Sequence, residues 1–165
     1  MKKWILNNKE DDQLTTSLHQ QLKIPMVIAK LLVQRGVSSF EEAKRFFRPS
    51  NEDFIDPFQM LGMEKAVERI VWSIEKNEHI LVYGDYDVDG TCSVTLMYLF
   101  LKELGAKVSY YQPDRYKEGY GISMEGVENA KNNNVGLIIS LDCGVKAIDQ
   151  SKKMAAYNID LIICD

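Results

Sequence analysis

The chain has 165 residues, of which 45% are hydrophobic and 27% are charged, and this composition is sufficient to bury an ordinary globular core. Its net charge of −4 argues against a general polyanion-binding surface, because nonspecific affinity for nucleic acids comes from Lys and Arg. No stretch is long and apolar enough to span a bilayer, and the three cysteines form no CxxC pair. We therefore expect a cytoplasmic protein with reduced thiols and no membrane partner.

The first 77 residues have a helical pattern. An apolar segment opens after Pro25 and stops at Gly36. Ser38 and Ser39 then precede FEEAKRFF, and a glutamate follows three residues after each serine, which is the signature of a capping box. Paired short helices more often pack against the rest of a protein than recognise DNA. The pattern predicts a small helical amino-terminal region, residues 1–77, that leads into the next domain.

From His79 onward, strand and helix patterns alternate. The predicted strands are ILVYG, AKVSYYQ, VGLIISL and DLIIC, and helix-length segments separate them. This alternation predicts an α/β fold, in which a parallel sheet of about four strands has helices on both faces. The helix predicted over 91–104 is apolar almost all round, so we expect it to be heavily buried.

Three of the apolar runs end on an aspartate, at Asp85, Asp142 and Asp165. The carboxyl ends of parallel strands lie along one edge of a sheet, so these side chains should converge there. So much negative charge is costly unless a cation neutralises it, which indicates a hard divalent metal site. The alternative is that the acids are turn residues, which are common where strands end. The coincidence of three strand-end acids favours the metal site.

The first run continues into Asp87-Val-Asp89-Gly90, in a loop that leads to a helix. Two carboxylates at i and i+2 can turn inward around one cation, and Gly90 lets the backbone leave the loop without crowding it. Asp142 can bridge to a second cation. Two metals about 3.5 to 4 Å apart activate a water and stabilise both oxygens in phosphoryl transfer. Asp87, Asp89 and Asp142 are thus the candidate catalytic and metal-binding residues.

The segment PDRYKEGYG, residues 113–121, contains candidate substrate-binding residues. Arg115 offers a planar fork for a phosphate, and Tyr120 stands between two glycines, where its ring can stack on a base. The alternative is a surface turn with an ion pair between Arg115 and Glu118. The residues alone leave both interpretations open.

Taken as a set, VYGDYDVDGT, IISLDCG and LIICD resemble the first three motifs of the DHH phosphoesterase superfamily, named for an Asp-His-His triplet. PDRYKEGYG is similar to the segment that marks its RecJ branch, the single-strand-specific 5′ to 3′ exonucleases. The resemblance implies a centre of two divalent metal ions, usually Mn²⁺ or Mg²⁺, that cleaves single-stranded DNA from its 5′ end. It also implies a role in DNA repair and recombination, where other repair proteins can be partners.

The resemblance implies a role for each acid. Asp87 and Asp89 match metal ligands of the first motif, and Asp142 matches the acid that bridges the metals. Asp85 matches a first-motif acid that supports these ligands or binds a metal itself. Asp165 falls on the Asp of the triplet, so we expect residues 78–165 to be the first part of a catalytic domain, inactive without the histidines that follow.

Two positions depart from the family pattern. Tyr83 stands where many relatives place a His ligand, which bears on the affinity or identity of one metal site. Cys143 replaces the usual Asn after the second-motif Asp, and we expect this to affect only the surroundings of the metal ligands.

Two other protein classes share parts of this pattern. Asp87-Val-Asp89-Gly90-Thr91 resembles the motif of haloacid dehalogenase-type phosphatases, but there the nucleophile follows the apolar strand directly. A non-enzymatic signalling receiver has an acidic pair after its first strand and a phosphorylated Asp after its third. A receiver should also have Ser or Thr after the fourth strand, where this chain has Asp165. Neither class accounts for PDRYKEGYG.

Overall fold

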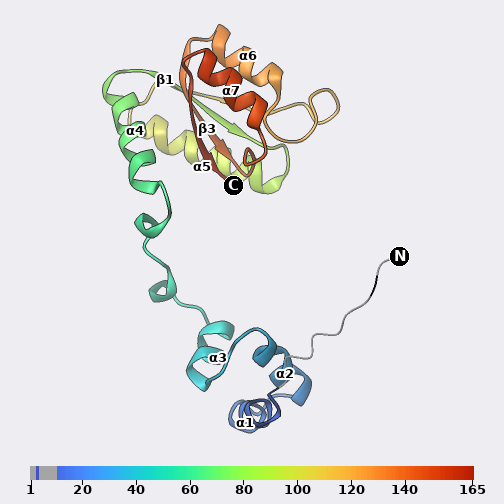
Figure 1. Ribbon diagram of the computed structural model, residues 1–165. Helices are drawn as coiled ribbons and strands as arrows, with labels where there is room; N and C mark the ends of the chain where they lie inside the picture. The colour runs from blue at the N-terminus through green and yellow to red at the C-terminus, as the bar shows by residue number, and fades with distance from the viewer. Residues whose placement is uncertain (1–2, 4–10) are drawn as a thin grey trace. The chain divides into compact units, whose positions relative to one another are not determined.

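The computed structural model describes Lys3 and residues 11–165 (Figure 1). Residues 1–2 and 4–10 of the predicted amino-terminal region lie outside the described part. The chain forms two compact units, which divide between Gln59 and Met60. No helix of the described residues is long and apolar enough to cross a membrane.

The amino-terminal unit is helical, as predicted. Its helices are α1 (Asp12–Leu22), α2 (Met26–Gln34) and α3 (Phe40–Phe47), followed by the 3₁₀ turns η1 (Asn51–Asp53) and η2 (Pro57–Gln59). The hydroxyl of Ser39 caps α3 by accepting from the Glu42 N–H, and the Glu42 carboxylate accepts from the Ser38 N–H at 2.6 Å. These bonds satisfy helix-terminal N–H groups, so the predicted capping signature marks the true start of the helix.

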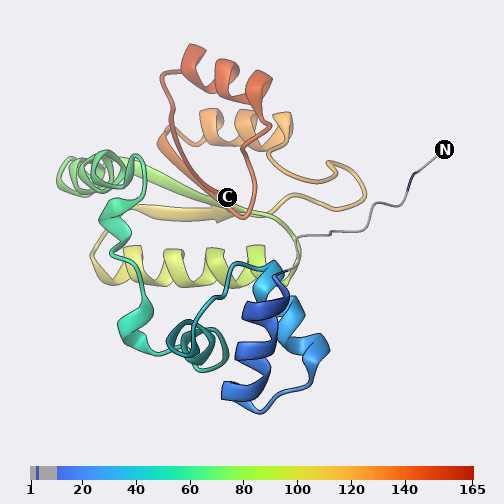
Figure 2. The same ribbon diagram turned by 60° about the horizontal axis from the view of Figure 1, so that its bottom comes forward.

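The second unit contains a four-stranded sheet in which every strand is parallel to its neighbours. Its strands are β1 (His79–Gly84), β2 (Val108–Tyr111), β3 (Val135–Leu141) and β4 (Asp160–Cys164), in the order β2-β1-β3-β4. Figure 2 shows the sheet between two helical layers. The predicted α/β fold class is confirmed.

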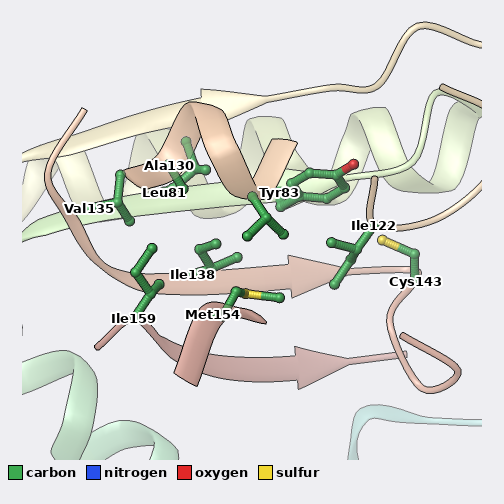
Figure 3. Packing of buried hydrophobic residues seen from close by; sticks show 10 residues of the cluster. Leu81, Tyr83, Ile122, Ala130, Val135, Ile138, Cys143, Met154 and Ile159 are labelled. Carbon is green, nitrogen blue, oxygen red and sulfur yellow. The ribbon is translucent and has the colours of Figure 1, made fainter. Parts of the chain in front are cut away.

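Helices cover both faces of the sheet. On one face lie α4 (Met63–Glu75) and α5 (Val88–Glu103), which pack on a cluster that includes Val82 and Ile139. On the other face lie α6 (Met124–Asn132) and α7 (Ile148–Ala156), over a cluster that includes Tyr83, Ile138 and Met154 (Figure 3). Alternate residues of one strand therefore contribute to opposite cores, as the two-residue period of a strand requires.

Helix α5 is less buried than we expected from its apolar sequence. Only Gly90, Val94 and Leu101 are fully buried on it, whereas Leu96 is 75% exposed and Phe100 is 56% exposed. The reason is geometric: α5 is an outer layer of its unit, so only the stripe that faces the sheet is covered.

Helix α4 belongs to the second unit, although its residues fall in the region that we predicted as the amino-terminal lead-in. Ile70 and Ile74 of α4 pack on the hydrophobic cluster beneath the sheet. The compact units therefore divide earlier than the predicted boundary after residue 77.

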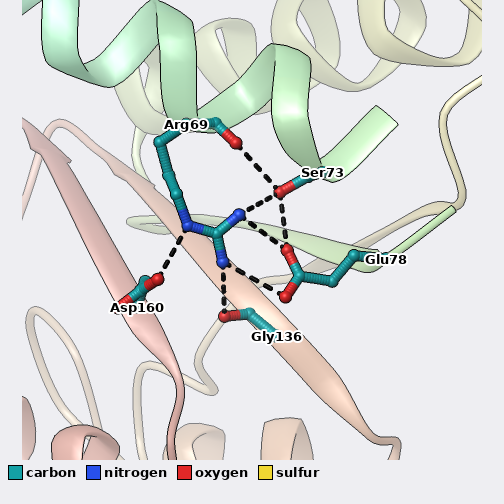
Figure 4. Close-up of polar contacts among 5 residues, drawn as sticks. All are labelled: Arg69, Ser73, Glu78, Gly136 and Asp160. Atoms are coloured by element: carbon teal, nitrogen blue, oxygen red, sulfur yellow. Dashed lines mark hydrogen bonds and ion pairs between the residues drawn. The ribbon is translucent and has the colours of Figure 1, made fainter. Parts of the chain in front are cut away.

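Arg69 on α4 joins this helix to the amino ends of three strands (Figure 4). Its guanidinium group lies 2.7 Å from a carboxylate oxygen of Glu78, before β1, and 2.7 Å from one of Asp160, at the start of β4. It also donates to the carbonyl of Gly136 in β3, and Ser73 donates to Glu78. This polar cluster fixes the end of the sheet opposite to the predicted site.

The strand order creates a topological switch point between β1 and β3. From β1 the chain crosses to β2 on one side, and it later returns to β3 on the other side of β1. The connection after β1 leads to β2 on one side of the sheet, and the connection after β3 leads to β4 on the other side, so the two connections run in opposite directions. Ligands of open α/β sheets bind at such a switch point.

Candidate active site

Helix α5 begins at the acids that follow β1. Asp87 is its N-cap, and the Asp87 side chain accepts from the Gly90 N–H at 3.0 Å. Asp89 and Gly90 therefore lie in the first turn of α5, whereas we expected both in a loop. The capping bond accounts for this difference, because it extends the helix back to Val88.

Gly90 has a different role from the one that we predicted. A Cβ atom at this position would lie 2.4 Å from the backbone oxygen of Asp85, which is far inside contact distance. Glycine is needed here because the first turn of α5 packs directly against the end of β1. The close approach keeps Asp87 and Asp89 beside the sheet edge.

Asp142 directly follows β3 and has a left-handed backbone conformation. Its φ angle is 58°, in the left-handed region that costs most non-glycine residues about 1–2 kcal/mol. Its N–H donates to the carbonyl of Cys164 at 2.9 Å, so the pairing with β4 continues to this point. Aspartate tolerates this region better than most residues, and Asn77, Asn134 and Asn158 adopt it as well, so the conformation reflects the turn of the chain after the strand.

Three acids from other segments lie close enough to influence Asp142. The pKa of Asp142 is raised, first by burial, and then by the charges of Asp87 and Asp89, a hydrogen bond with Asp87 and the charge of Asp165. Asp165 itself accepts from the Val145 N–H at 3.1 Å. The structure therefore brings these predicted site residues together at one edge, although they come from three separate segments of the chain.

Asp85 is the most unusual of the acids. It is 0% exposed, and neither oxygen of its carboxylate has a hydrogen-bond partner among the described residues. A buried carboxylate without partners is costly in free energy, and a nearby cation is the ordinary compensation. Burial, together with the charges of Asp85, Asp165 and Asp142, also raises the pKa of the Cys143 thiol to about 12.

These acids fit a hard divalent cation in their chemistry, because carboxylate oxygens are the ligands that Mg²⁺ and Mn²⁺ prefer. As the side chains are placed, however, no group of three or more His, Cys, Asp or Glu residues in the described part surrounds one metal position. The acids thus supply the charge and the donor atoms but not a complete coordination shell.

The segment after β2 brings Arg115 and Tyr120 to the same edge. The guanidinium of Arg115 lies 5.2 Å from the ring centroid of Tyr86, and the ring of Tyr120 meets Tyr86 edge-on with centroids 6.4 Å apart. Tyr120 is 69% exposed and donates to the carbonyl of Asp142 at 3.3 Å. No ion pair joins Arg115 to Glu118 among the described contacts, because Glu118 accepts from the Asp114 N–H instead.

We did not select Tyr86 from the sequence as a functional residue. It is half-buried, and it lies between two of the acids in the motif Asp85-Tyr86-Asp87. The only signal for it in the sequence is this position. Its contacts with Arg115 and Tyr120 depend on a segment about thirty residues away, which periodicity does not reveal.

A cavity of about 430 Å³ opens beside Asp165. This volume is within the range of small-molecule sites. The segments at residues 120–122 and 144–147 form its walls, together with Gln150. The cavity therefore adjoins both the acidic edge and the segment that presents Tyr120.

The hydroxyl of Tyr83, a position that we identified as a departure from the family pattern, makes hydrogen bonds within the domain. It donates to the carbonyl of Gly121 at 3.0 Å and accepts from the Ser123 N–H at 3.0 Å. Burial raises its pKa to about 12, so it stays neutral. Cys143 lies in the same hydrophobic cluster as Tyr83. Both departures from the family pattern thus serve packing in this chain.

The fold and the site together define an α/β domain with an acidic cluster at the carboxyl edge of a parallel sheet. Residues 79–165 match the DHH family, N-terminal domain. The chain belongs to the DHH family.

Curated relatives share sequence over almost the whole chain. It is 39% identical over 163 residues to the single-stranded-DNA-specific exonuclease RecJ of Bacillus subtilis (strain 168), with 99% of this chain and 21% of the relative covered. It is 32% identical over 161 residues to RecJ of Escherichia coli (strain K12), with 97% and 27% covered. The chain thus spans about a fifth to a quarter of the length of these relatives.

Solved structures share the fold. A crystal structure of exonuclease RecJ bound to manganese has a TM-score of 0.59 and 29% identity, covering 63% of this chain and 27% of the other. RecJ from Thermus thermophilus in complex with Mn²⁺ has a TM-score of 0.65 at 20% identity, covering 93% and 21%, which supports the fold alone. These relatives do not favour the haloacid dehalogenase-type phosphatase or the receiver.

Proposed function

We propose that this chain forms the first part of the catalytic centre of a single-stranded-DNA-specific exonuclease that hydrolyses phosphodiester bonds with two divalent metal ions. The observation that carries the proposal is the acidic edge, where Asp87, Asp89 and Asp165 lie close enough to raise the pKa of Asp142. The buried Asp85, whose carboxylate has no partner among the described residues, belongs to the same edge, since Asp85, Asp142 and Asp165 all act on Tyr120. The relatives named single-stranded-DNA-specific exonucleases support the choice of substrate.

Asp87, Asp89 and Asp142 would hold the metal ions, with Asp142 between the two sites. Asp85 and Asp165 would either bind a metal ion themselves or add negative charge next to the residues that do. Bound divalent ions supply an activated water and neutralise charge on the reacting phosphate. The crystal structure of exonuclease RecJ bound to manganese, and a further structure of RecJ from Thermus thermophilus in complex with Mg²⁺, support these two metals.

The chain's own residues provide the grip on DNA. Arg115 would bind a phosphate, since its guanidinium group has no carboxylate partner among the described contacts and is held over the Tyr86 ring. Tyr120 would stack on a base, because its ring is exposed beside the acidic edge. The cavity next to Asp165 would take part of the terminal nucleotide. We infer that the phosphate at Arg115 lies near the 5′ end, so that cleavage proceeds 5′ to 3′.

The proposed setting is DNA repair and recombination in the cytoplasm, with other repair proteins as partners. The three free cysteines and the relatives named single-stranded-DNA-specific exonucleases support this setting.

The two other classes fit the site less well. A phosphatase nucleophile directly after the first strand would be Asp85, which is fully buried and so cannot reach a phosphate in solution. The signalling function of a receiver does not require the contacts of Tyr86 with Arg115 and Tyr120.

Degradation of 5′-phosphorylated single strands tests the proposal. The full-length protein should release mononucleotides with Mn²⁺ or Mg²⁺, lose activity in chelator, and leave a blunt duplex intact. Activity that persists in chelator, or equal cleavage of single strands and duplex, would refute it. Titration should also detect two metal equivalents.

A further inference from the structure

The segment that carries Arg115 and Tyr120 has no regular secondary structure, so something else must fix its path. Glu118 lies in its middle and is half-buried. One carboxylate oxygen accepts from the Asp114 N–H at 2.8 Å, and the other accepts from the hydroxyl of Tyr111 at 2.9 Å and from the hydroxyl of Ser123. One side chain therefore ties together both ends and the middle of the segment.

Two of the three donors to Glu118 belong to regular elements of the domain. Tyr111 ends β2, and Ser123 is the N-cap of α6. The Tyr83 hydroxyl from β1 accepts from the Ser123 N–H, and the rings of Tyr83 and Tyr111 stack with centroids 5.4 Å apart. Glu118 thus attaches the irregular segment to β2 and to the start of α6, and the bond from Tyr83 to the Gly121 carbonyl attaches its far end to β1.

The charge of Glu118 is balanced by hydrogen bonds from neutral groups. Burial alone would raise its pKa, but the bonds from Asp114, Ser123 and Tyr111 outweigh burial and leave the pKa lowered. These neutral donors already bond to both carboxylate oxygens of Glu118, so Glu118 does not need an ion pair with Arg115. Arg115 is left over the ring of Tyr86, at the acidic edge.

We propose that Glu118 is a positioning residue, which sets Arg115 and Tyr120 for substrate by holding their segment to Tyr111 and Ser123. This inference rests on the proposed function, in which Arg115 binds a phosphate. Glu118 acts through the other residues and does not touch the substrate.

The test compares Glu118→Ala, Glu118→Gln and a control, Glu125→Ala, in the full-length protein. Glu125 is an exposed carboxylate in the first turn of α6. We expect Glu118→Ala to raise KM about tenfold for a 5′-phosphorylated single strand and less than about twofold for its 5′-hydroxyl counterpart, with kcat and Mn²⁺ affinity nearly unchanged. Glu118→Gln should recover part of the loss, since one carboxamide oxygen can still accept. The control should behave as wild type.

Two results would overturn the inference. One is an unchanged KM for both substrates in Glu118→Ala. The other is an equal loss for both substrates together with a lowered melting temperature, which would make Glu118 a structural residue only. If the wild-type protein shows no nuclease activity, the proposed function fails. If the wild type and Arg115→Ala behave as expected but Glu118→Ala does not, only the positioning role fails.

Discussion

The guanidinium of Arg115 lies 5.2 Å from the ring centroid of Tyr86, and it does not pair with Glu118 of its own segment. A cation over an aromatic face is held in place while its N–H groups remain free to bind an anion. The turn that carries Arg115 is therefore a candidate phosphate-binding site.

Replacing Arg115 should weaken binding of the 5′-phosphate. We expect Arg115→Ala to raise KM about tenfold or more for 5′-phosphorylated single strands, because a charge-assisted bidentate contact is lost. Arg115→Lys should recover little, since an ammonium group lacks the planar fork. Lys107→Ala, which removes an exposed cation before β2, is the control. Equal changes for 5′-phosphate and 5′-hydroxyl substrates would contradict the assignment.

Asp142→Asn should separate activity from stability. We expect kcat to fall by a factor of about 10² or more, because a bridging metal ligand is lost. The melting temperature without metal should stay the same or rise, since the raised pKa of Asp142 means that its charge is unfavourable in the folded protein. Asp149→Asn on α7 is the matched control. Unchanged Mn²⁺ binding in Asp142→Asn would rule out the bridging role.

Mn²⁺ should stabilise the folded chain, since a ligand that binds only the folded state at a hundred times its Kd adds about 2.7 kcal/mol. Thermal unfolding with Mn²⁺ and with chelator measures this effect. In Asp85→Asn we expect a higher melting temperature in chelator, because a buried unpaired charge is removed, and a smaller rise with Mn²⁺. If Mn²⁺ raises the melting temperature of Asp85→Asn as much as that of the wild type, Asp85 does not interact with the metal.

The Arg69 cluster should govern stability rather than catalysis. Arg69→Ala leaves Glu78 and Asp160 without their shared partner, and we expect a loss of about 3 kcal/mol in the free energy of unfolding. Denaturant unfolding measures it. Arg45→Ala, an exposed cation of the amino-terminal unit, should cost far less.

The same cluster predicts a pH dependence. Burial opposes ionisation of Glu78, but bonds from Arg69 and Ser73 prevail and lower its pKa below the ordinary 4.5. A lowered pKa contributes stability that is fully present above about pH 4.5 and is lost as pH falls through the folded value. Glu78→Gln should flatten this acid limb of the stability profile. An unaltered limb would assign the acid sensitivity to other carboxylates.

The sequence predicted the sheet well, because each strand is a short apolar run bounded by helix-length segments. It also predicted the gathering of acids at one edge, which follows from parallel strands alone. It did not predict that α5 begins at Val88, because that start depends on the side-chain cap from Asp87. Nor did it predict the exposed face of α5, since burial depends on the number of layers that pack around a helix. The metal-binding and substrate-binding roles stay predictions.

Strand β1 carries Tyr83, whose hydroxyl holds the segment that contains Arg115 and Tyr120. The buried acid Asp85 follows two residues further on. Two residues of extended chain span about 6.6 Å, and this length is set by covalent geometry. The point where β1 holds that segment and the buried acid beside the proposed metal ligands are therefore two residues apart at the end of a single strand. Substitutions in the surrounding helices can lower stability without changing that interval, whereas an insertion or deletion at the end of β1 would alter it even if the domain still folded.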